Sequence, residues 1–231
     1  EDTGRIPSIK ELFGFTIPLS LGGLFLSLSS VLIGMVISRA QDAEHLMPVY
    51  YLVLGIANPM AFAATRNQTL VVVFSSIKKN PRLFRFSILS GILLGLIPLI
   101  LIIPGMIELY YVKLQNASQA QVHLIRITAM SLLFYPLSVA LRSYAEGVAA
   151  GRKKPGNILT GQAVYLGVLS VSAIIAFFLR VPGNIIGSLA LIVSNIAAAS
   201  VLQVSLHFEE VQKRRFLDIR QKVQMPEMDK V

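Results

Sequence analysis

The chain contains no cysteine, and it is poor in charged residues, above all acidic ones. Without cysteine it can form neither a disulfide nor a thiolate metal site. Charged residues make up 14% of the 231 residues, with 21 basic and 12 acidic side chains, whereas soluble domains devote about a quarter of their residues to charge. Because 54% of the residues are hydrophobic and the mean hydropathy is +0.67, the composition indicates an integral membrane protein.

Motifs for enzymatic chemistry are also missing. The sequence has no phosphate-binding glycine loop, no zinc-ligand spacing, no hydrolytic triad and no ATPase module. Its histidines, His45, His123 and His207, lie far apart along the chain. We therefore expect no enzymatic activity, no metal site and no cofactor, and any transport would use a gradient or be passive conduction.

The formal charge of +9 would suggest nucleic acid as a partner of a soluble protein. In this chain the basic residues stand between apolar runs, and no aromatic residues that stack on bases are interleaved with them. We expect these charges to face a lipid bilayer, and we expect no nucleic-acid partner.

Six apolar runs are long enough to cross a membrane, because a hydrocarbon core of roughly 30 Å takes about 20 helical residues. They predict an all-α membrane protein in which residues 1–207 form a bundle of six transmembrane helices. The runs are Leu12–Ser38, Tyr50–Phe74, Phe84–Ile107, Ile125–Ala150, Ile158–Phe178 and Ile185–His207.

Lysine and arginine alternate between the connections of these runs. The odd connections hold only Arg39, Lys113 and Arg180, while the N-terminus, the even connections and the C-terminal tail are rich in basic residues. This is the positive-inside pattern, so we predict cytoplasmic termini in a protein of the inner or plasma membrane. The basic set is Arg5, Lys10, Lys78, Lys79, Arg82, Arg85, Arg152, Lys153, Lys154, Lys213, Arg214, Arg215, Arg220, Lys222 and Lys230.

Residues 208–231 are predicted to form a basic amphipathic cytoplasmic tail. Phe208, Val211, Phe216, Ile219 and Val223 recur at helical spacing with basic residues between them. Such a helix can lie on the anionic leaflet. A solvated tail that only fixes the topology fits the same pattern.

Two groups of residues carry packing information. Tyr50 and Tyr51 stand at the outer end of the second run, which suits an aromatic belt at the membrane interface. Gly161, Gly167 and Gly187 lie in the last two runs with the small-residue stretch 197–200. Small residues let helices approach closely, so we predict close packing there, with ordinary lipid-facing helices as the alternative.

Prolines stand inside four of the runs, at Pro18, Pro59, Pro98 and Pro136. Proline removes a helical hydrogen bond, and a membrane helix tolerates it where neighbouring helices or a water-lined cavity satisfy the freed carbonyl. Repeated broken or kinked spans are typical of proteins that move solutes. We predict hinges at Pro18, Pro59 and Pro136, while packing kinks without a role in transport fit equally well.

Polar side chains within the second and fourth runs are the candidate binding residues. An ionisable group at membrane depth costs several kcal/mol, so each one is a functional candidate. The pair Arg142 and Glu146 is separated by one helical turn. The candidates are Asn58, Arg66, Asn67 and Gln68 in the second run and Arg142 and Glu146 in the fourth.

The helical rise places Arg66 and Arg142 at similar depth, about 13 to 15 Å from the inner boundary. One hypothesis is that both line a cavity, that Glu146 compensates one of them, and that the net positive charge attracts a small anion. Asn58, Asn67 and Gln68 would then add polar contacts. The alternative is an Arg142–Glu146 pair that neutralises itself and packs against the second span.

The fourth run and its continuation carry a family resemblance. With a proline-bearing first run and basic inner connections, the chain resembles one six-helix half of the MATE-like multidrug, oligosaccharidyl-lipid and polysaccharide exporter superfamily. It is most similar to the carboxy-terminal half of the progressive ankylosis family of anion exporters, over scattered positions from Leu12 to Leu206. The residues concerned are Phe134-Tyr135-Pro136, Val139, Arg142, Gly147 and Gly151-Arg152-Lys153-Lys154-Pro155.

The resemblance implies two six-helix lobes around a cavity that opens alternately to each side. Only one lobe is present here. The chain begins at Glu1 and not at methionine, so we expect a fragment of a longer chain or a homodimer. Drug-exporting relatives couple to protons or sodium through acids in the first span, but Leu12–Ser38 contains none.

Three functions follow as alternatives. The first is a secondary, alternating-access exporter of a small anionic solute. The second is a lipid-linked oligosaccharide flippase or half of a cation or drug antiporter. The third is a non-transporting membrane subunit that assembles with partners.

Overall fold

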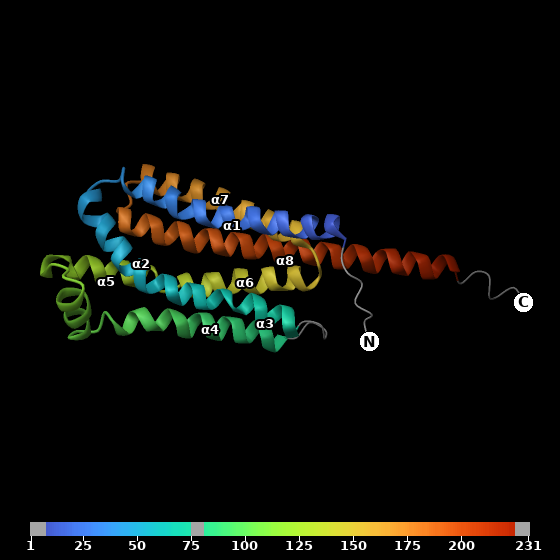
Figure 1. The fold of residues 1–231 in the computed structure, drawn as a ribbon, viewed down its shortest axis with the longest axis horizontal. Helices are drawn as coiled ribbons and strands as arrows, with labels where there is room; N and C mark the ends of the chain where they lie inside the picture. The colour runs from blue at the N-terminus through green and yellow to red at the C-terminus, as the bar shows by residue number, and fades with distance from the viewer. Residues whose placement is uncertain (1–7, 75–80, 225–231) are drawn as a thin grey trace, which may run out of the picture.

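The chain forms an elongated bundle of helices that run along one common axis (Figure 1). The computed structural model describes residues 8–74 and 81–224, without the side chains at 11, 15, 18, 19, 22, 26, 209, 210 and 212–224. Within this part it contains helices and no strand, which confirms the all-α prediction. The α-helices are α1 Ile9–Ile37, α2 Ala43–Thr65, α3 Asn67–Phe74, α4 Pro81–Ile100, α5 Val122–Ser131, α6 Tyr135–Gly151, α7 Pro155–Phe178 and α8 Gly183–Gln224, with short helices η1 Glu108–Leu114 and η2 Gln119–Gln121.

Five helical segments are long and apolar enough to cross a membrane, and they overlap the last five predicted runs. In the first run, the apolar stretch found among the described residues is Gly23–Ile37, which is shorter than a span. The membrane character is therefore supported by five helices, and the sixth span stays a prediction. The five segments are Ala43–Phe74, Pro81–Ile100, Gln119–Gly151, Pro155–Phe178 and Gly183–Phe208.

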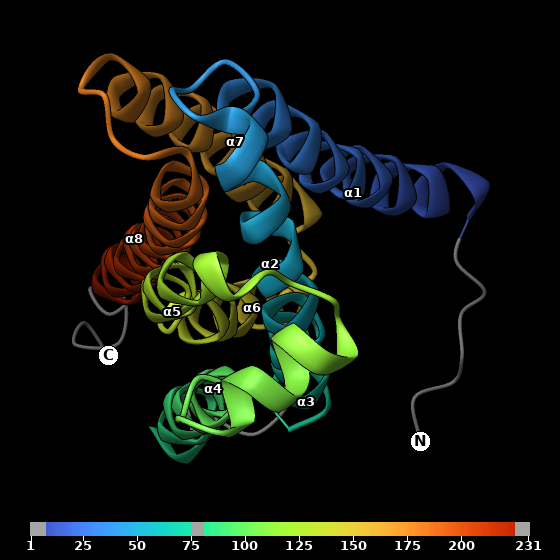
Figure 2. The same cartoon turned by 90° about the vertical axis from the view of Figure 1, so that its left-hand side faces the viewer.

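The bundle consists of two groups of helices that meet along α6 and α8. In one group α7 packs against both α1 and α8, and in the other α6 packs against α2, α3 and α4. Figure 2 shows this arrangement end on, with α4 and α1 on opposite sides of the molecule. Large apolar side chains such as Phe62, Leu89 and Phe178 are exposed on the outside, as expected where helices face lipid.

The connections alternate between the two ends of the bundle. One end of the bundle holds the beginning of α1 and the outward extension of α8 (Figure 1). The end of α3, the beginning of α4 and the α6–α7 connection lie at this same end. The basic residues Arg82, Arg85, Arg152, Lys153 and Lys154 stand at the ends of these helices. This geometry fits the alternating charge pattern, and the cytoplasmic orientation stays a prediction.

The tail continues α8 without interruption. The helical backbone extends to Gln224, so residues 208–224 are helical as expected. The amphipathic character of residues 208–231 stays a prediction, because most of its side chains and residues 225–231 lie outside the described part.

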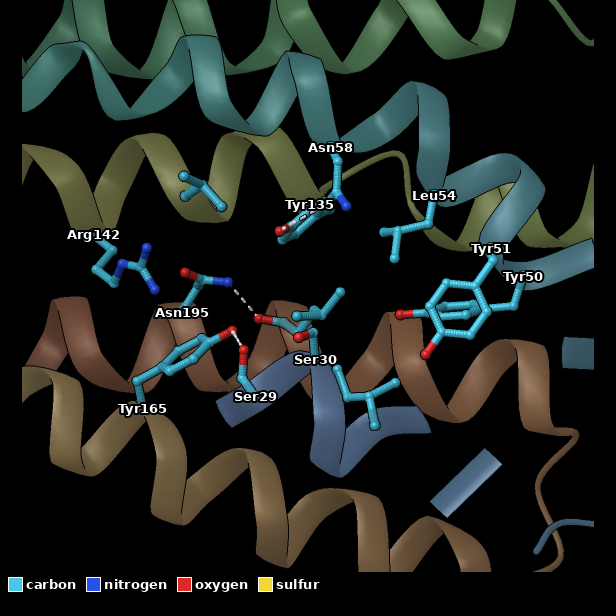
Figure 3. Close-up of a pocket in the computed structure, with 13 residues that line it drawn as sticks. Ser29, Ser30, Tyr50, Tyr51, Leu54, Asn58, Tyr135, Arg142, Tyr165 and Asn195 are labelled. Carbon is cyan, nitrogen blue, oxygen red and sulfur yellow. Dashed lines mark hydrogen bonds between the residues drawn. The ribbon is translucent and has the colours of Figure 1, made fainter. Parts of the chain in front are cut away.

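Two of the spans are discontinuous, but their breaks do not fall on the prolines. α2 passes through Pro59 and ends at Thr65, where the N–H of Arg66 donates to the Ala63 carbonyl at 3.1 Å in a tightened turn. Figure 3 shows α2 changing direction between the labelled Leu54 and Asn58, the turn whose hydrogen bonding Pro59 interrupts.

The second break, at residues 132–134, separates α5 from α6. Pro136 occupies the first turn of α6, where a helix has no partner for the missing N–H. Pro98 lies near the end of α4. Pro18 falls inside α1 at a position whose side chain lies outside the described part, so its role as a hinge stays a prediction.

Polar side chains fasten α5 to α8 on one side of this second break. The Asn184 Nδ2 group donates to the Thr128 hydroxyl at 2.8 Å, and the Ser131 hydroxyl donates to that of Ser188 at 2.7 Å. Interhelical hydrogen bonds of this kind contribute about 0.6 kcal/mol each in membrane proteins. They join the first half of span four to α8.

The prediction of close packing is confirmed at two glycines and is wrong at the third. A Cβ added at Gly161 would meet the side chain of Leu202 at 2.7 Å, and one at Gly187 would lie 2.5–2.7 Å from atoms of the Tyr50 ring. Gly167 has no atom within 4 Å of that position. Its surroundings are those of the outward-facing surface.

We expect Gly187→Ala to destabilise the protein by about 1–3 kcal/mol, because the added methyl group forces the buried Tyr50 ring out of its place against α8. Gly167→Ala is the matched control in an exposed helix position and should be neutral or slightly stabilising. Thermal melting in mild detergent measures both. Equal melting temperatures for the two variants would show that the Tyr50 ring is not tightly packed.

Candidate solute-binding pocket

A pocket of about 240 Å³ lies between α1, α2, α6, α7 and α8 (Figure 3). Ser30, Tyr51 and Asn58 at its edge are exposed, so the pocket opens onto the surface of the bundle, whereas Tyr165 and Asn195 are buried within it. It is lined by Ser29, Ser30, Ile33, Tyr50, Tyr51, Leu54, Asn58, Tyr135, Val139, Arg142, Tyr165, Leu191 and Asn195.

Most of this lining is polar, although the surrounding helices are among the most apolar of the chain. It presents four tyrosine hydroxyls, two serine hydroxyls, two asparagine amides and one guanidinium group. Convergent polar groups in a concave site are what fixes the orientation of a small ligand. The pocket can therefore receive a polar solute inside the membrane-spanning body.

Arg142 is the cation among the described residues that line the pocket, and it belongs to a buried ion pair. Its Nε atom lies 3.6 Å from Oε1 of Glu146, one turn further along α6. The guanidinium carbon lies 4.8 Å from the centre of the Tyr165 ring. Gln162 of α7 donates from Nε2 to the Glu146 carboxylate at 3.5 Å. Both charged residues are almost completely buried, at 5% and 4% exposure.

One hypothesis for these charges was a cavity lined by arginine, and the other was an Arg142–Glu146 pair that neutralises itself; the arrangement has features of both. Arg142 and Glu146 form the ion pair that the spacing predicts, yet Arg142 also lines a pocket while Glu146 does not. The carboxylate is buried and is not among the groups that line the pocket. The pair leaves the positive group at the pocket wall.

Several buried polar atoms of the lining have no hydrogen-bond partner among the described residues. They are the hydroxyl of Tyr50, Nε of Arg142 and Oδ1 of Asn195. An unsatisfied buried polar group costs about 1–3 kcal/mol, so native proteins satisfy such groups with water or a ligand. Their presence in the pocket wall favours a site that is hydrated or occupied.

The expectation that Arg66 shares a cavity with Arg142 is wrong within this bundle. Arg66 is exposed, its guanidinium carbon lies 5.2 Å from the centre of the Phe62 ring, and it is absent from the pocket lining. Arg66 follows Asn58 by eight residues, which turns it roughly 80° away from the face that Asn58 presents to the pocket. A similar predicted depth of Arg66 and Arg142 therefore did not mean that their side chains point the same way.

The remaining predicted polar contacts divide in the same way. Asn58 lines the pocket and accepts a hydrogen bond from the Tyr135 hydroxyl at 3.4 Å. Asn67 is buried and donates to the Ser90 hydroxyl at 3.0 Å, so it joins α3 to α4. Gln68 is half-buried and lies outside the pocket, where its backbone packs beside Gly147. Of the three, only Asn58 reaches the pocket.

Sequence reasoning missed most of the pocket wall. Tyr50 is fully buried and lines the pocket, so its assignment to an aromatic belt is corrected. Tyr165 of α7 donates to the hydroxyl of Ser29 on α1 at 3.3 Å, and both side chains line the pocket (Figure 3). Asn195, which shares the predicted run Ile185–His207 with one other amide side chain, that of Gln203, was an available signal for the contribution of α8.

Comparison of the chain with protein-family models, with curated proteins and with solved structures gives no match.

We expect Arg142→Ala to destabilise the protein by about 3–5 kcal/mol, because the change leaves the Glu146 carboxylate buried without its partner. Arg66→Ala removes an arginine that is exposed and should cost no more than about 0.5–1 kcal/mol, the value of its contact with Phe62. Chemical or thermal unfolding in detergent compares them. Equal losses of stability would contradict the assignment of Arg142 as the buried member.

Proposed function

We propose that this chain is one lobe of a secondary transporter that moves a small anionic solute across the inner or plasma membrane by alternating access. The observation that carries the proposal is the pocket within the apolar bundle, with the Arg142 guanidinium in its wall and paired with the buried Glu146. Soluble and purely structural membrane helices have no need of such a site.

The chemistry of the lining favours an anion. Guanidinium forms paired, charge-assisted hydrogen bonds with carboxylate and phosphate oxygens. The hydroxyl of Tyr135 and the amide of Asn195 line the pocket on the side of Arg142, whereas Tyr50 lies toward the other end (Figure 3), and hydroxyl and amide groups donate to oxyanions. A small oxyanion would satisfy several of these groups at once.

A complete transport path needs a second wall, because the pocket opens at its edge onto exposed residues of α1 and α2. A second six-helix lobe, either another part of a longer chain or a second copy of this one, would supply it. The discontinuous spans two and four border the pocket region, and broken helices beside a binding site are typical of alternating access. The predicted cytoplasmic termini would place the basic connections on the inner side.

The proposal is tested by uptake of radiolabelled phosphate, sulfate and succinate into proteoliposomes that contain the full chain. The double variant Arg142→Gln/Glu146→Gln removes both charges, leaves neither one buried alone, and should reduce uptake at least tenfold. Arg126→Gln, in the same span but outside the pocket, should retain it. Unchanged uptake in the double variant would remove the pair from the mechanism.

A non-transporting assembly subunit is the second candidate, because Asn67 fulfils one of its expectations. This amide is buried and serves contact between α3 and α4, as it would in a helix that only packs. Whether water reaches position 58 distinguishes the two functions, since an assembly subunit has no need of a water-filled pocket.

The absence of cysteine allows a direct test of water access. We expect Asn58→Cys, at the edge of the pocket, to react with a small membrane-impermeant thiol reagent, and Asn67→Cys, buried between helices, to react at least tenfold more slowly. Labelling in proteoliposomes measures both rates. An unreactive thiol at position 58 in folded protein would favour the assembly subunit.

A further inference from the structure

We propose that Glu146 is a proton-binding site, and that the carboxylate takes up one proton from solution when an anion enters the pocket beside Arg142. Transport would then be coupled to protons through the fourth span. This inference rests on the proposed function, because it concerns what the anion does to the Arg142–Glu146 pair.

The positive charge of Arg142 and the negative charge of Glu146 balance each other only while the pocket holds no anion. Oε1 of Glu146 lies 3.6 Å from Nε of Arg142, and both side chains are shielded from solvent. An anion bound at the pocket wall adds a second negative charge beside the same guanidinium. Two anions sharing one buried cation disfavour each other, and protonation of Glu146 restores the balance while Arg142 keeps its charge.

The hydrogen-bond partners of Glu146 suit both protonation states. In the charged state, the carboxylate accepts from Nε2 of Gln162 at 3.5 Å. In the protonated state, it carries an O–H group and needs an acceptor. Oε1 of the same Gln162 is buried and has no partner among the described residues. One amide of α7 thus offers a donor to the charged form and an acceptor to the neutral form.

No other described charge competes for this role. From the helices packed against α6, Gln162 and Tyr165 of α7 contact the pair, and the uncharged amides of Asn58 on α2 and Asn195 on α8 line the same pocket as Arg142. The charged or titratable residues on α4, on the part of α8 near the pair and at the α2–α3 break are exposed. They are Arg82, Arg85, His207 and Arg66.

The test uses sulfate, which carries no proton near neutral pH, so that any proton entering with it has bound to the protein. Proteoliposomes of the full chain are clamped at zero membrane potential, and sulfate uptake and internal pH are followed together. We expect about one proton per sulfate in the wild type, and a roughly tenfold change in sulfate accumulation per unit of pH gradient, as one coupled proton requires.

Glu146→Gln mimics the protonated form and should carry sulfate without protons and without response to the pH gradient. Glu44→Gln, which changes an exposed acid of α2, should keep the coupling. Gln162→Leu removes both the donor and the acceptor that Gln162 offers to the carboxyl group, leaves the ion pair, and should weaken the pH response, which keeps the test valid if Glu146→Gln does not fold.

The outcomes separate the two proposals. Sulfate uptake without protons in the wild type, or coupling that persists in Glu146→Gln, would overturn the proton site and leave the anion transporter standing. A wild type that carries none of phosphate, sulfate and succinate at any pH would overturn both.

Discussion

A positive charge held inside an apolar bundle is the constraint around which this structure is arranged. Arg142 cannot be buried alone, because an unpaired charge in low dielectric is too costly to retain. Its carboxylate partner comes from one turn further along α6, its aromatic and amide neighbours come from α7, and α8 closes the pocket beside it. The central position of α6, in contact with both groups of helices, is therefore what this charge requires.

Run length and local spacing predicted the helices and the ion pair well. The thickness of the lipid bilayer sets the length that an apolar run needs to cross it. The separation of Arg142 and Glu146 by four residues brings them together in any helix. Depth along a helix also follows from the sequence, since the rise per residue is fixed. These features depend on one helix at a time.

The direction in which a side chain points around its helix axis was not predicted from the sequence in the same way. Arg66 is exposed and does not line the pocket, because it stands eight residues beyond Asn58 and is turned away from the face that Asn58 presents to the pocket. Tyr50 near a span end fitted a membrane interface, but Gly187 of a distant helix makes room for its ring inside the bundle. Such placements are set by contacts between helices that lie far apart in the sequence.

The break in span four separates two helices, α5 and α6, that have different roles. Before the break, α5 is tied to α8 by two side-chain hydrogen bonds, and beyond it α6 carries the charged pair. Because α8 also packs along α6 and α7, a pivot at residues 132–134 would bend span four while α8 keeps α5 joined to the helices that hold the charges. A rocking motion of such a lobe need not separate opposite charges in lipid, because both members of the pair stand on one helix.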